Sequence, residues 1–232
     1  MGGGAGRRVV AEKHDDPGYV TWGWKDRLLP TRRWYYGKLL RGKATMVALD
    51  TLPYFYALSE NYGDPSDYLL EYEAGRLGVE SKQVYETLLT HGPLDTLALR
   101  REAHLTSRDS NSRFERALVE LQRGLRILPV GIAEAGRWKY AFIYDMVDRW
   151  LPQVVAQARA IGRGEARAHL AGVYLRSVGA AREAQLVQLF HWRKDDVSQA
   201  CAALAHDGRV AWVTQLAGQS GEWWATAALG EK

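Results

Sequence analysis

One order of segments occurs twice along the chain: two helices, a third helix that ends at a glycine, and two strands. In the first copy, a helical pattern from residue 81 stops at Gly92, and a third helix ends at Gly124. A strand-like run at 125–132 and an alternation of aromatic residues at 138–144 follow. Three helices and a hairpin in this order predict a winged helix-turn-helix.

Local signals refine the first copy. Thr96 is placed to cap the short second helix, 97–103, and Ser112-x-x-Glu115 matches a capping box for the third. In that third helix, the apolar residues Phe114, Leu118 and Leu121 recur at helical spacing and are expected to face inward. Pro129 has no N–H to donate, so we expect it at an edge or a bulge of the first strand.

The second copy has little residue identity with the first. Its expected helices cover 165–178, 182–190 and 195–206, with Gly179 and Gly208 after the first and third, and its strands cover 209–213 and 222–226. The predicted fold class is mostly α with small β-hairpin wings, that is α+β, built from tandem winged helix-turn-helix units.

These units give a division of the whole chain. We expect a flexible, Gly-rich tail at 1–20 and an aromatic-rich helical region at 21–80, a candidate for a partial winged-helix unit. Within that region, 31–40 and 43–59 have helical composition, and Pro53 is expected to break or kink the latter. The first winged helix-turn-helix covers 81–144, a helical connector 145–164, and the second winged helix-turn-helix 165–228.

Composition excludes several classes of protein. The single cysteine, Cys201, allows neither an internal disulfide nor a Cys-based zinc site, and favours a reducing compartment. The six histidines are scattered, and no HExxH, GxGxxG, P-loop or GxSxG motif occurs, so we expect no metal and no cofactor. Without an apolar run of membrane length or a signal-like start, the expectation is a cytoplasmic protein with no membrane contact.

Charge indicates a nucleic acid as the partner. The net charge is only +4, but residues 1–43 and 92–144 are basic, whereas 44–91 are acidic. On the third helix of the first unit the outward face carries arginines, which can read guanine or neutralise phosphate. The alternative is a solvated helix with weak Glu–Arg pairs. The candidate DNA-binding residues of this unit, including its hairpin, are Arg108, Asn111, Arg113, Arg116, Arg123, Arg137 and Lys139.

Two other segments are open to interpretation. Arg32, Arg33 and Lys38 alternate with Trp and Tyr residues, which could form a stacking and phosphate surface, although aromatic residues more often form a core. The third helix of the second unit begins with Asp195 and Asp196, which suit a helix N-terminus and oppose phosphate, so this unit is expected to be mainly structural.

Short motifs resemble those of the family related to the AlkZ/YcaQ DNA glycosylases, over about residues 20–215. They are Trp24-Lys25-Asp26, Leu29-Pro30, 35–40 (YYGKLL), 53–59 (PYFYALS), Gly92-Pro93-Leu94, Ala135-Gly136-Arg137 and Ser177-Val178-Gly179-Ala180. The resemblance implies three winged-helix units around a concave DNA-binding channel. In true members it also implies hydrolysis of the N-glycosidic bond of N7-alkylated purines, including those in interstrand cross-links.

The catalytic signature that the resemblance implies, Gln-x-Gln or Gln-x-Asp, is absent from this chain. Asp50 matches its second position, but Ala48 stands where the glutamine would be. We therefore expect a protein that binds duplex or damaged DNA without catalysis. The alternatives are a DNA glycosylase that uses Asp50 as its catalytic residue, and a protein-interaction module whose Trp- and Tyr-rich N-terminal half contacts another chain.

Overall fold

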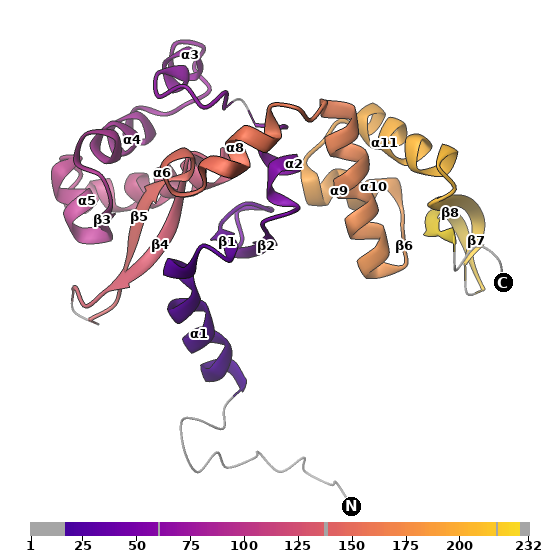
Figure 1. Cartoon of the computed structure of the whole chain (residues 1–232), viewed down its shortest axis with the longest axis horizontal. Coiled ribbons are helices and arrows are strands. Elements are labelled where there is room, and N and C mark those ends of the chain that lie inside the picture. The colour runs from indigo at the N-terminus through magenta and orange to yellow at the C-terminus, as the bar shows by residue number, and fades with distance from the viewer. Residues whose placement is uncertain (1–16, 60, 137–138, 217, 228–232) are drawn as a thin grey trace, which may run out of the picture.

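The structure, a computed structural model, describes residues 17–59, 61–136, 139–216 and 218–227. It is an α+β fold of many helices and three small antiparallel sheets. Figure 1 shows two lobes on either side of a central segment. The first lobe holds α3–α6 with β3–β5, the second holds α9–α11 with β6–β8, and β1, β2, α2 and α8 lie between them.

The first lobe contains the predicted order of three helices and a hairpin. Its elements are α4 (Val79–His91), β3 (Leu94–Asp95), α5 (Thr96–Glu102), α6 (Asn111–Arg123), β4 (Ile127–Ala133) and β5 (Ala141–Met146). The strands form one antiparallel sheet in the order β3-β5-β4. Phe114, Leu118 and Leu121 are buried as expected, and the register shifts between Pro129 and Gly131, which is the expected bulge.

The caps of these helices differ from the prediction. Asp95, not Thr96, caps α5, because its carboxylate accepts the N–H groups of Leu97 and Ala98, while the Thr96 hydroxyl donates to the Phe142 carbonyl of the hairpin. The capping box at Ser112 is also wrong. A 3₁₀ turn, η3 (Arg108–Ser110), precedes α6, and Ser107 caps that turn, so Ser112 already lies inside the helix.

The second lobe has the same order of elements. They are α9 (Arg163–Val178), β6 (Ala180–Ala181), α10 (Glu183–Phe190), α11 (Lys194–His206), β7 (Val210–Leu216) and β8 (Gln219–Thr226), with a sheet in the order β6-β8-β7. Cys201 is buried in its core, and burial raises the pKa of this thiol to about 12. The thiol is therefore a packing group and not a nucleophile.

The region 21–80 is only in part the helical segment that its composition indicates. Residues Trp34–Gly37 and Thr45–Ala48 form an antiparallel pair, β1 and β2. Their aromatic and β-branched side chains suit a half-buried sheet, and Tyr35 and Val47 enter the core. The region also contains α2 (Leu52–Tyr56), α3 (Asp67–Glu73) and a 3₁₀ turn, η2 (Leu29–Thr31). Pro53 lies in the first turn of α2, where its missing N–H costs nothing.

The first helix, α1 (Pro17–Leu28), projects from the base of the central segment (Figure 1) and begins inside the segment expected as a tail. It is held to the hairpin of the first lobe by Lys25. The Lys25 ammonium donates to the Tyr140 hydroxyl at 2.9 Å, pairs with Asp26 at 2.9 Å and lies over the Phe142 ring. Burial of this side chain is tolerated because its charge is paired and caged by aromatic rings.

The connector between the lobes consists of α7 (Val147–Trp150) and α8 (Pro152–Ala158). Val147, Leu151, Val154 and Val155 form a core with Leu52 of α2, so the connector and the central segment pack as one layer. Nowhere in the described ranges is there a helix with the length and apolar character that crossing a membrane requires.

Candidate nucleic-acid interface

The exposed face of α6 carries the arginines that the sequence singles out. Arg108 lies in η3, Asn111 begins α6, and Arg116 and Arg123 follow on the helix; all four side chains are exposed. In a helix-turn-helix, the helix that follows the turn and its N-terminal end are the parts that approach the DNA groove. If the first lobe is the predicted helix-turn-helix, these groups lie where such contacts are expected.

Part of this face is already used within the protein. Arg113 pairs with Glu80 of α4 at 3.4 Å. Glu120 accepts hydrogen bonds from the Gly78 N–H and the Ser81 hydroxyl, which fixes the beginning of α4 against α6. Arg113 and Glu120 thus connect the two helices, and Arg108, Arg116 and Arg123 are the more accessible cations of this face.

The C-terminal end of α6 meets the β1–β2 loop. The Lys38 N–H donates to the Gln122 side chain at 3.0 Å. Arg123 and Arg41 line a cavity of about 220 Å³ together with aromatic residues of the second lobe, among them Phe190 and Trp192. The structure therefore brings Lys38 and Arg123, which are far apart in sequence, to the junction of the two lobes.

The other predicted cations lie apart from this junction. Arg32 has a left-handed backbone, φ 54°, and its guanidinium stacks on the Trp150 ring at 4.1 Å, so one of its faces is occupied. Arg33, beside it, is exposed, and Lys139 is exposed in the β4–β5 turn. Arg137 lies outside the described residues. Of the aromatic residues near Arg32, Tyr35 and Tyr36 belong to the core.

Asp50 lies in the exposed turn between β2 and α2 and accepts a hydrogen bond from the Thr51 hydroxyl at 3.0 Å. Close to it, Tyr54 of α2 stacks on His169 of α9, with ring centroids 3.6 Å apart and planes at 1°. Burial lowers the pKa of His169, as do the charges of Arg176 and Arg209, whereas Asp50 and Glu165 act in the opposite direction. Burial and the two guanidinium groups therefore favour the neutral form of this imidazole, and the two carboxylates oppose them.

His169, Arg176 and Arg209 are not among the site residues that the sequence predicts. His169 and Arg176 lie seven residues apart on α9, which places them on one face of the helix, and Arg209 comes just before β7. That spacing was a usable signal for the two α9 residues. Arg209 comes close to His169 only through the tertiary fold, so no sequence pattern indicates that they are neighbours.

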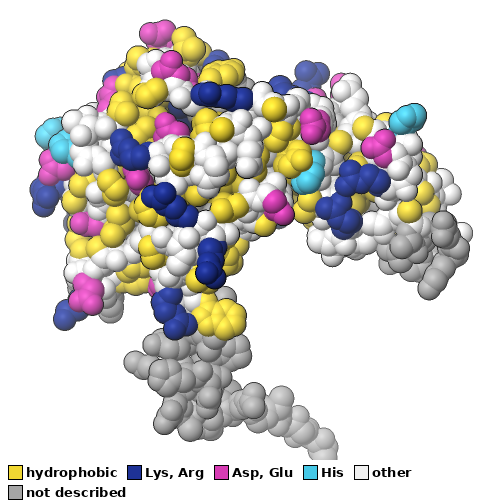
Figure 2. All heavy atoms as spheres, viewed as in Figure 1, with side chains coloured by type: hydrophobic (Ala, Val, Ile, Leu, Met, Phe, Trp, Pro, Cys, Tyr) yellow, Lys and Arg dark blue, Asp and Glu magenta, His cyan; other side chains and the backbone are white. Residues whose placement is uncertain are grey.

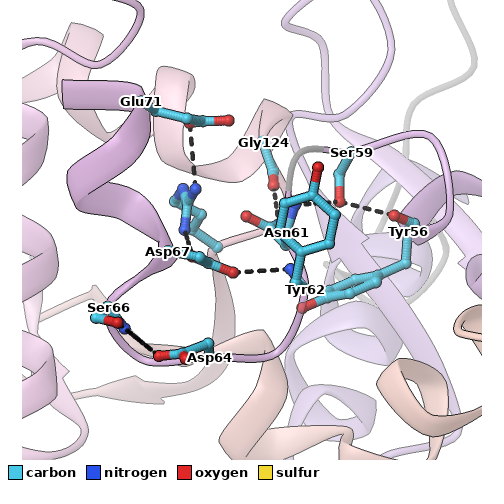
Figure 3. Close-up of polar contacts among 10 residues, drawn as sticks. Tyr56, Ser59, Asn61, Tyr62, Asp64, Ser66, Asp67, Glu71 and Gly124 are labelled. Carbon is cyan, nitrogen blue, oxygen red and sulfur yellow. Dashed lines mark hydrogen bonds and ion pairs between the residues drawn. The ribbon is translucent and has the colours of Figure 1, made fainter. Parts of the chain in front are cut away.

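The sequence also does not indicate the buried polar cluster around Asp67 and Asn61 (Figure 3). Arg126 pairs with Asp67 at 2.6 Å and with Glu71 at 3.2 Å, and the Tyr62 N–H donates to Asp67 at 2.7 Å. The Asn61 amide donates to the Gly124 carbonyl, which joins the loop before α3 to the end of α6. Because Arg126 is buried and paired with two carboxylates, this cluster holds the fold and does not face a ligand.

On the face drawn in Figure 2, Lys and Arg side chains gather in two places: over the first lobe down to the base of α1, and over the second lobe. The surface between the central segment and the second lobe is indented. Within the ranges that the structure describes, no group of three or more His, Cys, Asp or Glu side chains could hold a metal ion. The basic groups and the indentation are the features available to a polyanion.

Comparison with known proteins agrees with this architecture. The structure of the DNA glycosylase AlkZ from Streptomyces sahachiroi matches with a TM-score of 0.58 at 13% identity, over 93% of this chain and 57% of that one. This chain thus spans less than two thirds of the length of that structure. No curated protein matches. A family model described as AlkZ related matches residues 7–191, most of the chain. The chain therefore belongs to the AlkZ-related family.

Proposed function

We propose that this protein binds duplex or damaged DNA without catalysis. The observation that carries the proposal is the exposure of Arg108, Arg116 and Arg123 on η3 and α6 of the first lobe, the part of a helix-turn-helix that meets DNA. Membership in a family related to a DNA glycosylase supports the same partner.

Further cations extend this surface in the proposal. Lys139 on the β4–β5 turn would contact the phosphate backbone from the hairpin, and Lys38, together with Arg33, from the central segment. Asn111 at the start of α6 would contribute a polar contact, and Arg113 would contribute when released from Glu80. Arg32 would contact phosphate with the guanidinium face that Trp150 leaves open.

The absence of catalysis in this proposal rests on one substitution. The residue two positions before Asp50 is Ala48, which has no group that could position a water molecule. Asp50 itself receives a hydrogen bond from Thr51 and lies in an exposed turn, not in a site closed to water.

DNA binding is tested by fluorescence anisotropy of a labelled duplex over a range of NaCl concentrations. We expect the wild type to bind with an affinity that falls linearly on a log–log scale as salt rises, because phosphate contacts release counterions. The variant Arg108→Gln/Arg116→Gln should bind about tenfold or more weakly in low salt. The variant Arg101→Gln/Arg193→Gln removes the same charge from two other exposed arginines and should bind like the wild type. Equal affinity of both variants contradicts the assignment.

A second candidate is a DNA glycosylase that uses Asp50. It is favoured by the position of Asp50 near His169 and Tyr54, where a carboxylate, an imidazole and an aromatic ring come together. Incubation with a duplex containing 7-methylguanine, followed by alkaline cleavage at abasic sites, separates the candidates. Strand cleavage that is lost in Asp50→Asn would establish the glycosylase, whereas binding without abasic sites supports the first proposal.

A further inference from the structure

Two guanidinium groups of the second lobe converge over one glycine. A Cβ atom placed on Gly172 of α9 would lie 3.1 Å from Arg209 Nη2 and 3.5 Å from Arg176 Nη1. Gly172 is buried, whereas both arginines are exposed. The missing side chain at this position therefore lets both cations lie against the surface of the helix.

Neither arginine is neutralised by the protein. Across the described parts of the chain, no carboxylate lies within ion-pair distance of Arg176 or Arg209, although Arg167 on the same helix pairs with Asp196 at 3.2 Å. Like charges held close together repel unless an anion lies between them. A phosphate between the two guanidinium groups would accept charge-assisted hydrogen bonds from both.

The position of the pair is suited to a chain that passes between the lobes. His169 lies on the same helix and stacks on Tyr54 of the central segment, so this face of α9 borders the centre of the molecule. By contrast, the first turn of α11 carries Asp195 and Asp196, whose carboxylates pair with Arg193 and Arg167 and offset the charge of these two arginines. The basic and acidic sides of the second lobe thus lie on different elements.

We propose that Arg176 and Arg209 form a DNA-phosphate site, through which the second unit contacts DNA with α9 and the residue before β7 instead of with α11. The proposal rests on the proposed DNA-binding function and adds to it a second contact point. A strand that reaches both α6 of the first lobe and α9 of the second would cross the central segment.

The groups that face His169 make this histidine a reporter of the site. Arg176 and Glu165 approach it from its own helix, Arg209 from the segment before β7, and Asp50 from the connection between β2 and α2. A phosphate bound between the two arginines offsets the effect of their positive charges on the imidazole. The proton affinity of His169 therefore rises when the site is filled.

The test compares Arg176→Gln/Arg209→Gln with Arg101→Gln/Arg193→Gln, which loses the same charge elsewhere. With a labelled duplex, we expect the first variant to bind about five- to tenfold more weakly near 0.1 M NaCl. Its slope of log affinity against log salt should be shallower by about one unit, the loss of about one phosphate contact. The second variant should keep the wild-type slope.

The outcomes separate this inference from the proposed function. If the wild type binds no duplex, both the proposed DNA-binding function and the phosphate site are contradicted. If it binds, and the Arg176→Gln/Arg209→Gln variant has the same slope as the control, only the phosphate site is overturned. An independent readout needs no variant: NMR titration of His169 in the wild type should give a higher pKa with duplex than without. An unchanged value also overturns the site.

Discussion

At the scale of single residues, Arg126 is the charge on which the first lobe most depends. Its guanidinium is 2% exposed and is shared between Asp67 and Glu71, both on α3. The side chain also lies over the Tyr85 ring of α4 at 5.6 Å. It therefore joins α3 and α4 to the beginning of β4, and its loss leaves two carboxylates close together without a counter-charge.

Replacing Arg126 by Met should lower the free energy of unfolding by about 3–5 kcal/mol, the usual cost of leaving one partner of a buried pair uncompensated. Urea denaturation followed by circular dichroism measures this loss. Lys82→Met serves as the control, because Lys82 pairs with Glu86 one turn along the same helix at a partly exposed position, and such an i,i+4 pair contributes at most about 1 kcal/mol. Similar losses in the two variants would show that the buried Arg126 cluster stabilises the protein no more than the Lys82–Glu86 pair does.

Arg126 also shows where sequence reasoning stops at this scale. It is one of several arginines in a basic segment, and nothing in its neighbours distinguishes it from the exposed Arg123 three residues earlier. Its partners come from α3, more than fifty residues away. A charge pattern predicts that such a residue lies on the surface. Only the fold shows that Arg126 is buried and paired with carboxylates.

At the scale of elements, the best-predicted segments are those whose signals are local. The helices α4, α6, α9 and α11 follow from apolar periodicity ended by glycine, and the bulge near Pro129 follows from its missing N–H. Composition predicts helices where β1 and β2 lie, because each strand is only four residues long and is stabilised by contacts with residues distant in the sequence. One example is the Tyr35 hydroxyl, which donates to the Gln122 carbonyl.

The cap of α5 gives a test at this scale. Asp95→Ala removes the carboxylate that accepts the N–H groups of Leu97 and Ala98, and should destabilise the protein by about 1 kcal/mol. Asp109→Ala, an exposed aspartate in η3, should change stability by a few tenths of that amount. Both are measured as the shift in urea midpoint at constant m-value, and a larger effect of Asp109→Ala would contradict the assigned cap.

At the scale of the whole molecule, the two lobes are connected through the central segment, and α2 contacts both. Leu52 and Tyr56 of α2 pack in a core with the connector, while Tyr54 stacks on His169 of α9. Phe55, also on α2, contacts Phe190 of α10. The relative placement of the lobes, and therefore the indentation between the central segment and the second lobe, depends on these aromatic contacts. No periodicity in the sequence indicates these aromatic contacts, because each joins residues that are far apart in the chain.

The lowered pKa of His169 should make stability depend on pH. The pKa of His169 is lower in the folded protein than in the unfolded chain, mainly because burial disfavours the charged imidazole. Its stabilising contribution is therefore complete above the unfolded value, about 6.5. It is lost progressively as pH falls from there through the folded pKa, because the unfolded chain binds the proton first.

Thermal unfolding of the wild type and of His169→Phe at pH 7.5, 6.5 and 5.5 measures this contribution. Phenylalanine keeps a ring against Tyr54 but cannot take up a proton, so the variant should lose less stability than the wild type between pH 7.5 and 5.5. The difference between the two proteins cancels the titration of carboxylates that both contain. His206→Phe, at an exposed position in the last turn of α11, should follow the wild-type pH dependence. If His169→Phe loses as much stability as the wild type over this pH range, folding does not lower the pKa of His169.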